Sequence, residues 1–233
     1  MLELFPEGFE ELDAGDGVEL VAYTDAGGEE RLWAAFGSVS SEAMAGGWED
    51  RWRAFHRPVR VGPLWIGPPW EEAPAAANTV IIDPGRAFGT GGHPTTRLCL
   101  QLLLDLEPRG SLLDVGCGSG VLAIAAARLG FSPVVAIDHD EAALEAVERN
   151  ARANGVSLDL RRADALAETP PATDAVVANV SGAFVEQLAP QLRSPAMIVS
   201  GYLESERPEA PGYGAERRVV QEGWAADLFR HQE

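Results

Sequence analysis

A glycine-rich loop between an apolar strand and a helix constrains the fold of this 233-residue chain more than any other feature. The loop follows the apolar run 112–115 and contains three alternating glycines, Gly116, Gly118 and Gly120. Glycines allow a tight turn and let a ligand approach the backbone closely, and the helix after such a loop begins with free N–H groups. This strand–loop–helix unit is typical of α/β folds that bind a nucleotide-like cofactor at the carboxyl end of a strand.

A second glycine-rich segment lies shortly upstream, and it reads Phe-Gly-Thr-Gly-Gly-His-Pro-Thr-Thr-Arg from Phe88 to Arg97. It is too polar to form core, so two loops close together in the chain predict a cofactor site with a covering segment. We expect Phe88 to close over the site, or to act only as a hydrophobic latch. One of Thr95 and Thr96 is expected to cap the following helix, and the other to contact the cofactor.

Beyond residue 78 the apolar pattern alternates between strands and helices. The expected strands are 79–83, 111–115, 134–138, 158–161, 175–180 and 197–200, with a terminal antiparallel pair at 217–221 and 224–230. The expected helices are 94–106, 121–129, 140–153 and 182–192. This alternation predicts an α/β fold with a doubly wound, mostly parallel sheet of seven strands that is covered on both faces.

The N-terminal part has a different pattern. Val18–Tyr23 and Arg31–Phe36 alternate like strands around the turn-forming sequence 25–28, which predicts a hairpin. Ser40 or Ser41 is expected to begin a helix that runs to Phe55. A proline-rich stretch follows and is typical of a connector. The expected organisation is a small α+β extension, a linker and a cofactor-binding domain: 1–67, 68–78 and 79–233.

Composition narrows the class of partner. The formal net charge is −18, which argues against DNA binding because phosphate attraction needs clustered Lys and Arg. A basic protein would be attracted to such a surface, although an acidic surface also serves solubility. No apolar run reaches the about 20 residues that cross a bilayer, and Met1–Glu11 lacks the pattern of a signal peptide. We expect a cytoplasmic protein without a metal site, since the two cysteines form no ligand framework.

Four polar residues near the glycine loop match what S-adenosylmethionine requires. Asp138, which follows Gly116 by 22 residues, can accept both ribose hydroxyls of an adenosine. Asp114 precedes the first glycine, where it can meet the methionyl ammonium group directly or through water. Asp164 is expected to face the adenine amino group or to cap the next turn. Asn179 lies near the end of an expected strand and places a carboxamide at the point where the methyl group would be transferred.

An NAD-dependent dehydrogenase is the rival interpretation, because Gly118, Gly120 and Ala123 fit the G-x-G-x-x-A fingerprint. Asp114 argues against it, since a carboxylate would be unfavourable beside a pyrophosphate. The hydroxyl groups of the upstream loop and the Asn179 carboxamide also favour S-adenosylmethionine. A module that binds this cofactor without catalysing transfer is a further alternative.

Asn179 is the candidate catalytic residue. Its carbonyl oxygen can accept a hydrogen bond from an amine nucleophile and orient the lone pair, or the residue can serve only to hold the cofactor. His93 has an ordinary pKa near ~6.5 and could act as a base, but a role in fixing the loop is favoured.

Four segments of the chain resemble the ribosomal protein L11 methyltransferases, the PrmA family: 48–61, 80–100, 113–127 and 177–180. The loop from Phe88 to Arg97 is the most specific of the shared motifs. The resemblance implies a Rossmann-like class I methyltransferase fold and S-adenosylmethionine as cofactor. It also implies a basic ribosomal protein as substrate, methylated on lysine or N-terminal amines. The family's cofactor-contacting positions fall on Thr96, Gly116, Asp138 and Asn179.

The chain departs from the family pattern at its N-terminal end. Family members carry a ferredoxin-like recognition domain, whereas only about 67 residues precede the linker here. We therefore expect a shortened substrate-recognition unit. Another protein or a small-molecule amine is the alternative acceptor.

Overall fold

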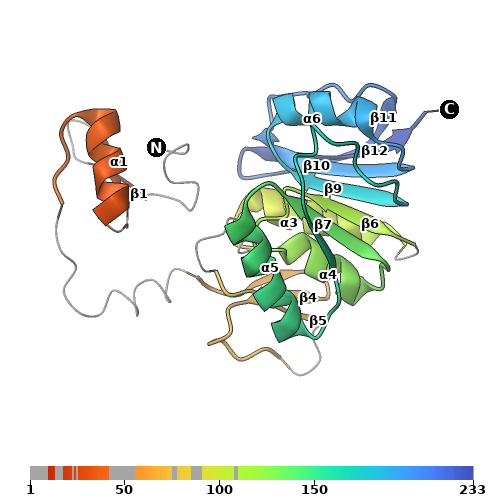
Figure 1. The fold of residues 1–233 in the computed structure, drawn as a ribbon, viewed down its shortest axis with the longest axis horizontal. Helices are drawn as coiled ribbons and strands as arrows, with labels where there is room; N and C mark the ends of the chain where they lie inside the picture. The colour runs from red at the N-terminus through yellow and green to blue at the C-terminus, as the bar shows by residue number, and fades with distance from the viewer. Residues whose placement is uncertain are drawn as a thin grey trace. The chain divides into compact units, whose positions relative to one another are not determined.

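The computed structural model describes residues 10–13, 18–22, 24, 26–41, 56–74, 78–84, 91–107 and 110–232. The chain forms two compact units, Met1–Phe55 and His56–Glu233. Both are drawn in Figure 1, the first in red and orange at the N-terminal end of the colour bar.

In the N-terminal unit, β1 (Glu10–Asp13) pairs antiparallel with β2 (Val18–Val21). The helix α1 covers Ala26–Phe36, so the predicted hairpin partner at Arg31–Phe36 is wrong. Leu32 and Phe36 stand four residues apart in an alanine-containing run, a spacing that suits a helix as well as a short strand. The helix expected to run from Ser40 or Ser41 to Phe55 falls on residues 42–55, which lie outside the described residues.

A three-stranded sheet begins the large unit. β3 (Val59–Val61) is antiparallel to β4 (Leu64–Gly67), which is parallel to β5 (Asn78–Ile81). These strands pack with the domain that follows, so the division between the units lies after Phe55. The proline-rich segment after Gly67 therefore joins two neighbouring strands of one sheet.

The second sheet has the strand order β11-β12-β10-β9-β6-β7-β8, and β12 is antiparallel to both of its neighbours. The remaining adjacent pairs are parallel. The predicted mostly parallel sheet of seven strands is thus confirmed. Its strands are β6 Leu112–Val115, β7 Val134–Asp138, β8 Asp159–Arg162, β9 Ala175–Asn179, β10 Ala196–Leu203, β11 Tyr213–Gln221 and β12 Trp224–His231.

Helices cover both faces of this sheet, as Figure 1 shows. Alternate strand residues such as Leu112 and Val177 pack with one set of helices, and Leu113 and Val176 pack on the opposite face with α6. The helices are α3 Pro94–Asp105, α4 Val121–Leu129 and α5 Glu141–Asn154 on the first face, and α6 Gly182–Leu188 on the second.

The helix expected at 182–192 is shorter than predicted. It ends at Leu188 and continues as a 3₁₀ turn, Ala189–Gln191, because Pro190 has no N–H group for the next helical bond. Within the described ranges, no helix is long and apolar enough to cross a membrane.

The order in which successive strands are added to the sheet reverses between β6 and β9. The strands β7 and β8 follow on one side of β6, whereas β9 and β10 lie on the other. Val115 pairs with Ala178, so the next residues, Gly116 and Asn179, emerge side by side at the carboxyl edge. Ligands of open α/β sheets bind at this kind of topological switch.

Candidate functional site

The glycine loop turns tightly over the end of β7. The N–H groups of Gly116 and Cys117 donate to the Ile137 carbonyl oxygen at 2.9 and 3.1 Å. All three loop glycines have positive φ, namely 68° at Gly116, 52° at Gly118 and 81° at Gly120, a region that side chains rarely tolerate. A β-carbon at Gly120 would also lie only 2.8 Å from Val147 Cγ1 on α5. The loop therefore requires its glycines for conformation and for close packing.

Asp138 ends β7 beside this loop and is 8% exposed. Its Oδ2 accepts the N–H of Gly118 at 3.0 Å, and its Oδ1 accepts the N–H of Asp140 at 3.0 Å. Each carboxylate oxygen has a further lone pair. The side chain is therefore fixed in orientation and retains the capacity to accept two hydroxyl groups, as an adenosine ribose would require.

Asp114 on β6 has no exposed surface. Its Oδ2 accepts the N–H of Ala123 in α4 at 3.0 Å, while its buried Oδ1 has no hydrogen-bond partner among the described residues. Burial, with a smaller contribution from the neighbouring charge of Asp138, raises the pKa of Asp114 to about 7 against the opposing effect of the Ala123 hydrogen bond. A buried acceptor without a partner is costly, so this oxygen fits a ligand that brings a positively charged donor. A contact of Asp114 with the methionyl ammonium group stays a prediction, because the side chain has no exposed surface.

Asn179 links the end of β9 to the start of α3. Its Nδ2 donates to Thr95 Oγ1 at 3.1 Å and to Thr96 Oγ1 at 3.4 Å. Both threonines are buried, at 1% and 0% exposure. Because the amide nitrogen faces the two hydroxyl groups, Oδ1 of Asn179 faces away from them. The structure therefore brings together three predicted site residues from segments more than 80 positions apart.

His93, and not a threonine, caps α3. Its Nδ1 accepts the N–H of Thr95 at 3.3 Å and lies 2.7 Å from Thr95 Oγ1. The expectation that Thr95 or Thr96 caps the helix is wrong, because both hydroxyl groups are directed toward Asn179. Polar contacts thus connect Asn179 Nδ2 to Thr95 Oγ1 and Thr95 Oγ1 to His93 Nδ1.

The environment of His93 favours the neutral form of its ring. Burial lowers its pKa, and the charge of Arg97 lowers it further against the opposing effect of Glu222. The ring edge packs against Trp224 of β12, with centroids 4.9 Å apart. These contacts support a role in fixing the loop rather than in taking a proton.

For two other predicted site residues, Asp164 and Phe88, the described residues give no contact with the site. Asp164 is exposed, and its Oδ1 accepts the N–H of Leu166 at 2.9 Å, which favours the alternative in which it caps a turn. A contact with an adenine amino group stays a prediction. Phe88 lies outside the described residues.

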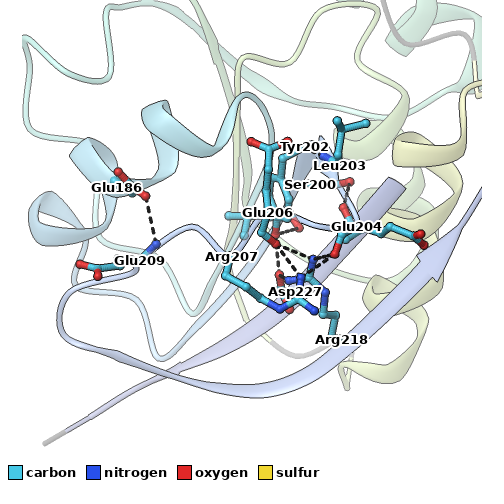
Figure 2. Close-up of polar contacts among 12 residues, drawn as sticks. Glu186, Ser200, Tyr202, Leu203, Glu204, Glu206, Arg207, Glu209, Arg218 and Asp227 are labelled. Carbon is cyan, nitrogen blue, oxygen red and sulfur yellow. Dashed lines mark hydrogen bonds and ion pairs between the residues drawn. The ribbon is translucent and has the colours of Figure 1, made fainter. Parts of the chain in front are cut away.

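A polar network holds the segment that follows β10 (Figure 2). Arg218 donates to the carbonyl oxygens of Glu204 and Glu206 at 3.0 and 2.7 Å, and to Asp227 Oδ2 at 2.9 Å. The Tyr202 hydroxyl lies 2.7 Å from the same Asp227 oxygen. Asp227 is 4% exposed. One buried carboxylate therefore orients the cation that anchors residues 203–207.

This segment packs beside the end of β9. Gly201 has φ +106°, and a β-carbon there would lie 2.3 Å from the Val180 carbonyl oxygen. A β-carbon at Gly182 would lie 3.4 Å from Pro208 Cβ. The residues that directly follow Asn179 thus lie close to Gly201 and Pro208, which flank the anchored segment, so this segment borders the carboxyl edge of the sheet. The charged residues of the network lie in two stretches that gave only a weak strand pattern, so sequence reasoning missed them.

Two buried asparagines of α5, Asn150 and Asn154, were also missed. Both lie on the otherwise apolar stripe of the helix, with Ala143, Val147 and Ala151. Polar residues on a buried helix face must find hydrogen-bond partners, and that expectation was the available signal. Asn150 donates to the Ser119 carbonyl oxygen of the glycine loop at 2.9 Å.

The family model for Ribosomal protein L11 methyltransferase (PrmA) matches residues 20–227. The ribosomal protein L11 methyltransferase of Tolumonas auensis is 44% identical over 173 residues, which are 70% of this chain and 59% of that protein. The corresponding protein of Pseudomonas putida is 43% identical over 192 residues, which are 76% of this chain and 65% of that protein. The chain thus spans less than two thirds of the length of these relatives.

Two solved structures are similar to this chain. The ribosomal protein L11 methylase of Lactobacillus delbrueckii subsp. bulgaricus superposes with a TM-score of 0.70 at 28% identity, covering 76% of this chain and 100% of that chain. The putative methyltransferase yhhF of Escherichia coli shares the fold, with a TM-score of 0.53 at 18% identity over 59% of this chain and 87% of that chain. From residue 20 to residue 227, this chain belongs to the ribosomal protein L11 methyltransferase (PrmA) family.

Proposed function

We propose that this chain is an S-adenosylmethionine-dependent N-methyltransferase that acts on amines of a basic ribosomal protein, the L11 protein named in its relatives. The observation that carries the proposal is the pair of carboxylates beside the glycine loop, Asp114 with an unpaired buried oxygen and Asp138 at the next strand end. Family membership and the class I fold support the same cofactor.

Each half of the cofactor has a candidate partner. Asp138 would accept the ribose hydroxyls, and Asp114 would meet the methionyl ammonium group directly or through water. The glycines of the loop would let the ligand approach its backbone closely. Thr96 completes the set through the buried hydroxyl contact with Asn179. When bound, S-adenosylmethionine supplies a methyl group already activated by its sulfonium sulfur.

The protein's main tasks are then to position the acceptor amine and to keep it neutral. A lysine with pKa ~10.4 loses its proton at pH 7 at a cost of roughly 4.6 kcal/mol. Oδ1 of Asn179 would accept an N–H of the neutral amine and so direct its lone pair toward the methyl group. Because Thr95 and Thr96 hold Nδ2, the direction of Oδ1 is fixed before the substrate arrives. Such preorganisation can contribute up to ~7–11 kcal/mol to a reaction between two bound partners.

Substrate choice would rest on charge and on the N-terminal unit. The net charge of −18 attracts a basic protein, and residues 1–55 are the proposed recognition unit. A ribosomal substrate would place the reaction in the cytoplasm. The alternative acceptors are a different basic protein or a small amine.

The test is incubation of the purified chain with isotopically labelled S-adenosylmethionine and purified ribosomal protein L11, followed by mass spectrometry of the product. Transfer of label to lysine or N-terminal amines of L11 supports the proposal, with the Asp138→Ala variant as the unlabelled control. Label in another protein of a cell lysate, and none in L11, would identify that protein as the substrate in place of L11. Binding of the cofactor without transfer to any acceptor would favour the non-catalytic module, and a melting temperature raised by NAD would favour the dehydrogenase.

A further inference from the structure

Asn150 is a single buried side chain that bridges the glycine loop and the backbone at Asp83, just after β5. It is 2% exposed on α5. Its Nδ2 donates to the Ser119 carbonyl oxygen at 2.9 Å, and its Oδ1 accepts the N–H of Asp83 at 3.0 Å. Ser119 belongs to the glycine loop, whereas Asp83 begins the segment that leads to His93 and α3. One carboxamide therefore uses both ends to join segments 36 residues apart in the chain.

The bond to Ser119 determines how the glycine loop presents its backbone. The peptide group between Ser119 and Gly120 has its C=O directed to Asn150, and its N–H donates to the Cys117 carbonyl oxygen at 2.8 Å. Both ends of this peptide are thus anchored. Rotating it would disturb the tight turn that places the N–H of Gly118 on Asp138. The orientation of the ribose-binding carboxylate therefore depends on the same turn that Asn150 holds.

The same helix face contacts the loop a second time. Val147 lies one turn before Asn150, and its Cγ1 would be 2.8 Å from a β-carbon at Gly120. Residues three apart on a helix share a face, so Val147 and Asn150 approach the loop together. In Figure 1, α5 lies beside β5, which leads to Asp83, and beside α4, which follows the glycine loop.

Asn154, one turn further along α5, has a different pattern of contacts. Its Oδ1 accepts the N–H of Ile81 at 2.8 Å, and its Nδ2 donates to the Ile81 and Asn150 carbonyl oxygens at 2.6 and 2.8 Å. It is 6% exposed. These bonds fix α5 to β5 and do not reach the glycine loop. Asn154 is therefore a matched residue of the same type, helix face and burial.

We propose that Asn150 is a positioning residue for cofactor binding, which couples the glycine loop to the backbone at Asp83, after the end of β5. This inference rests on the proposed function, because it assumes that the glycine loop binds S-adenosylmethionine. Asn154 in contrast supports only the packing of α5 against β5. The two residues should then differ in their effect on ligand affinity while having similar effects on stability.

The experiment compares Asn150→Ala with Asn154→Ala in the full chain. Titration calorimetry with S-adenosylhomocysteine measures affinity, and thermal unfolding measures stability. We expect both variants to melt at a similarly lowered temperature, but Asn150→Ala to bind about tenfold or more weakly and Asn154→Ala within about threefold of wild type. If either alanine variant fails to fold, Asn150→Ser and Asn154→Ser provide the same comparison with a smaller loss of polar contacts.

Hydrogen exchange without ligand gives a second readout. Asn150→Ala should accelerate amide exchange both at Asp83 and in Gly116–Gly120, whereas Asn154→Ala should accelerate it at Ile81 without reaching the glycine loop. Wild-type affinity in Asn150→Ala, or an equal loss of affinity in both variants, would overturn the inference alone. A wild-type chain that does not bind S-adenosylhomocysteine would refute the proposed function, and the inference with it.

Discussion

At the scale of single residues, Asp114 couples folding to ligand binding. The unfolded chain holds this carboxyl group at pKa ~3.9, whereas burial raises the pKa to about 7 in the fold. Between those values the folded state binds the proton more tightly, so its free energy of unfolding falls as the pH rises from about 4 to about 7. The loss is complete above the folded pKa. A bound ammonium group would favour the ionised form and reverse this cost.

Asp114→Asn should therefore stabilise the unliganded chain and weaken ligand binding. At pH 8 the ionisation of buried Asp114 costs roughly 4 kcal/mol of folding free energy, and the asparagine removes this cost. The unpaired amide N–H of the asparagine in turn costs about 1–3 kcal/mol. We expect a higher melting temperature at pH 8, a gain that disappears near pH 4, and at least about tenfold weaker binding of S-adenosylhomocysteine. Calorimetry at both pH values measures these quantities. A lower melting temperature at pH 8 with unchanged affinity would contradict the assignment.

Asp138→Ala should abolish detectable binding of S-adenosylhomocysteine, because it removes the acceptor of the ribose hydroxyls and releases the N–H of Gly118. Asp140→Ala is the matched control, since Asp140 caps α5 through the N–H of Ala142 at 3.0 Å. Loss of that cap costs about 1 kcal/mol of stability and should leave affinity unchanged. Circular dichroism checks that both variants are folded. Undiminished binding by Asp138→Ala would place the ligand elsewhere.

Residues at strand ends could be predicted from the sequence, because a glycine or a carboxylate after an apolar run marks the carboxyl edge of a sheet. Asp138 and Asn179 both lie where that pattern placed them. The cap at His93 could not be predicted, since threonine hydroxyls are good caps in general and their contact with Asn179 depends on tertiary structure. Arg218 was missed for the same reason, because the carbonyl groups that it binds lie 14 and 12 positions away.

At the scale of elements, glycines and prolines decided which boundaries could be predicted. The helix 121–129 and the strand 134–138 have the bounds expected from the sequence, because glycine precedes and follows the helix and Pro133 precedes the strand. The pattern failed at Arg31–Phe36, where six residues are too few to separate a helical period from an alternating one. Short segments of this kind are decided by neighbours distant in sequence.

The junction of β10, β11 and β12 should depend on the buried pair Arg218–Asp227. Their side chains are 20% and 5% exposed, and removing one partner of a buried ion pair typically costs about 3–5 kcal/mol. We expect Asp227→Ala to lower the free energy of unfolding in urea by an amount in that range. Glu216→Ala is the control: the pair of Glu216 with Arg230 is 46% and 47% exposed and should contribute below about 1 kcal/mol. Equal losses in both variants would show that the network does not stabilise the junction.

At the scale of the whole molecule, the cofactor positions and the proposed recognition unit lie in different parts of the chain. The described members of the candidate site all belong to His56–Glu233. We infer that this unit contains what is needed to bind the cofactor, and that residues 1–55 serve the protein substrate.

A chain of residues 56–233 should therefore bind S-adenosylhomocysteine within about threefold of the full-length affinity. Its transfer of methyl groups to a ribosomal protein should fall, with the loss appearing in KM for the protein. Titration calorimetry and a methylation assay at several substrate concentrations measure the two effects. Unimpaired KM would remove the recognition role from residues 1–55, and lost affinity for the small ligand would show that they complete the cofactor site.

The position of β12 also has a consequence for the order in which the candidate site is assembled. β12 lies between β10 and β11, so β11 reaches the sheet only through a strand that is translated after it. The same strand supplies Trp224, which packs on the His93 ring at the start of α3. Until the β11–β12 hairpin docks, the cap of α3 lacks one of its supports. During synthesis, the candidate cofactor site should thus be complete only after this hairpin has docked.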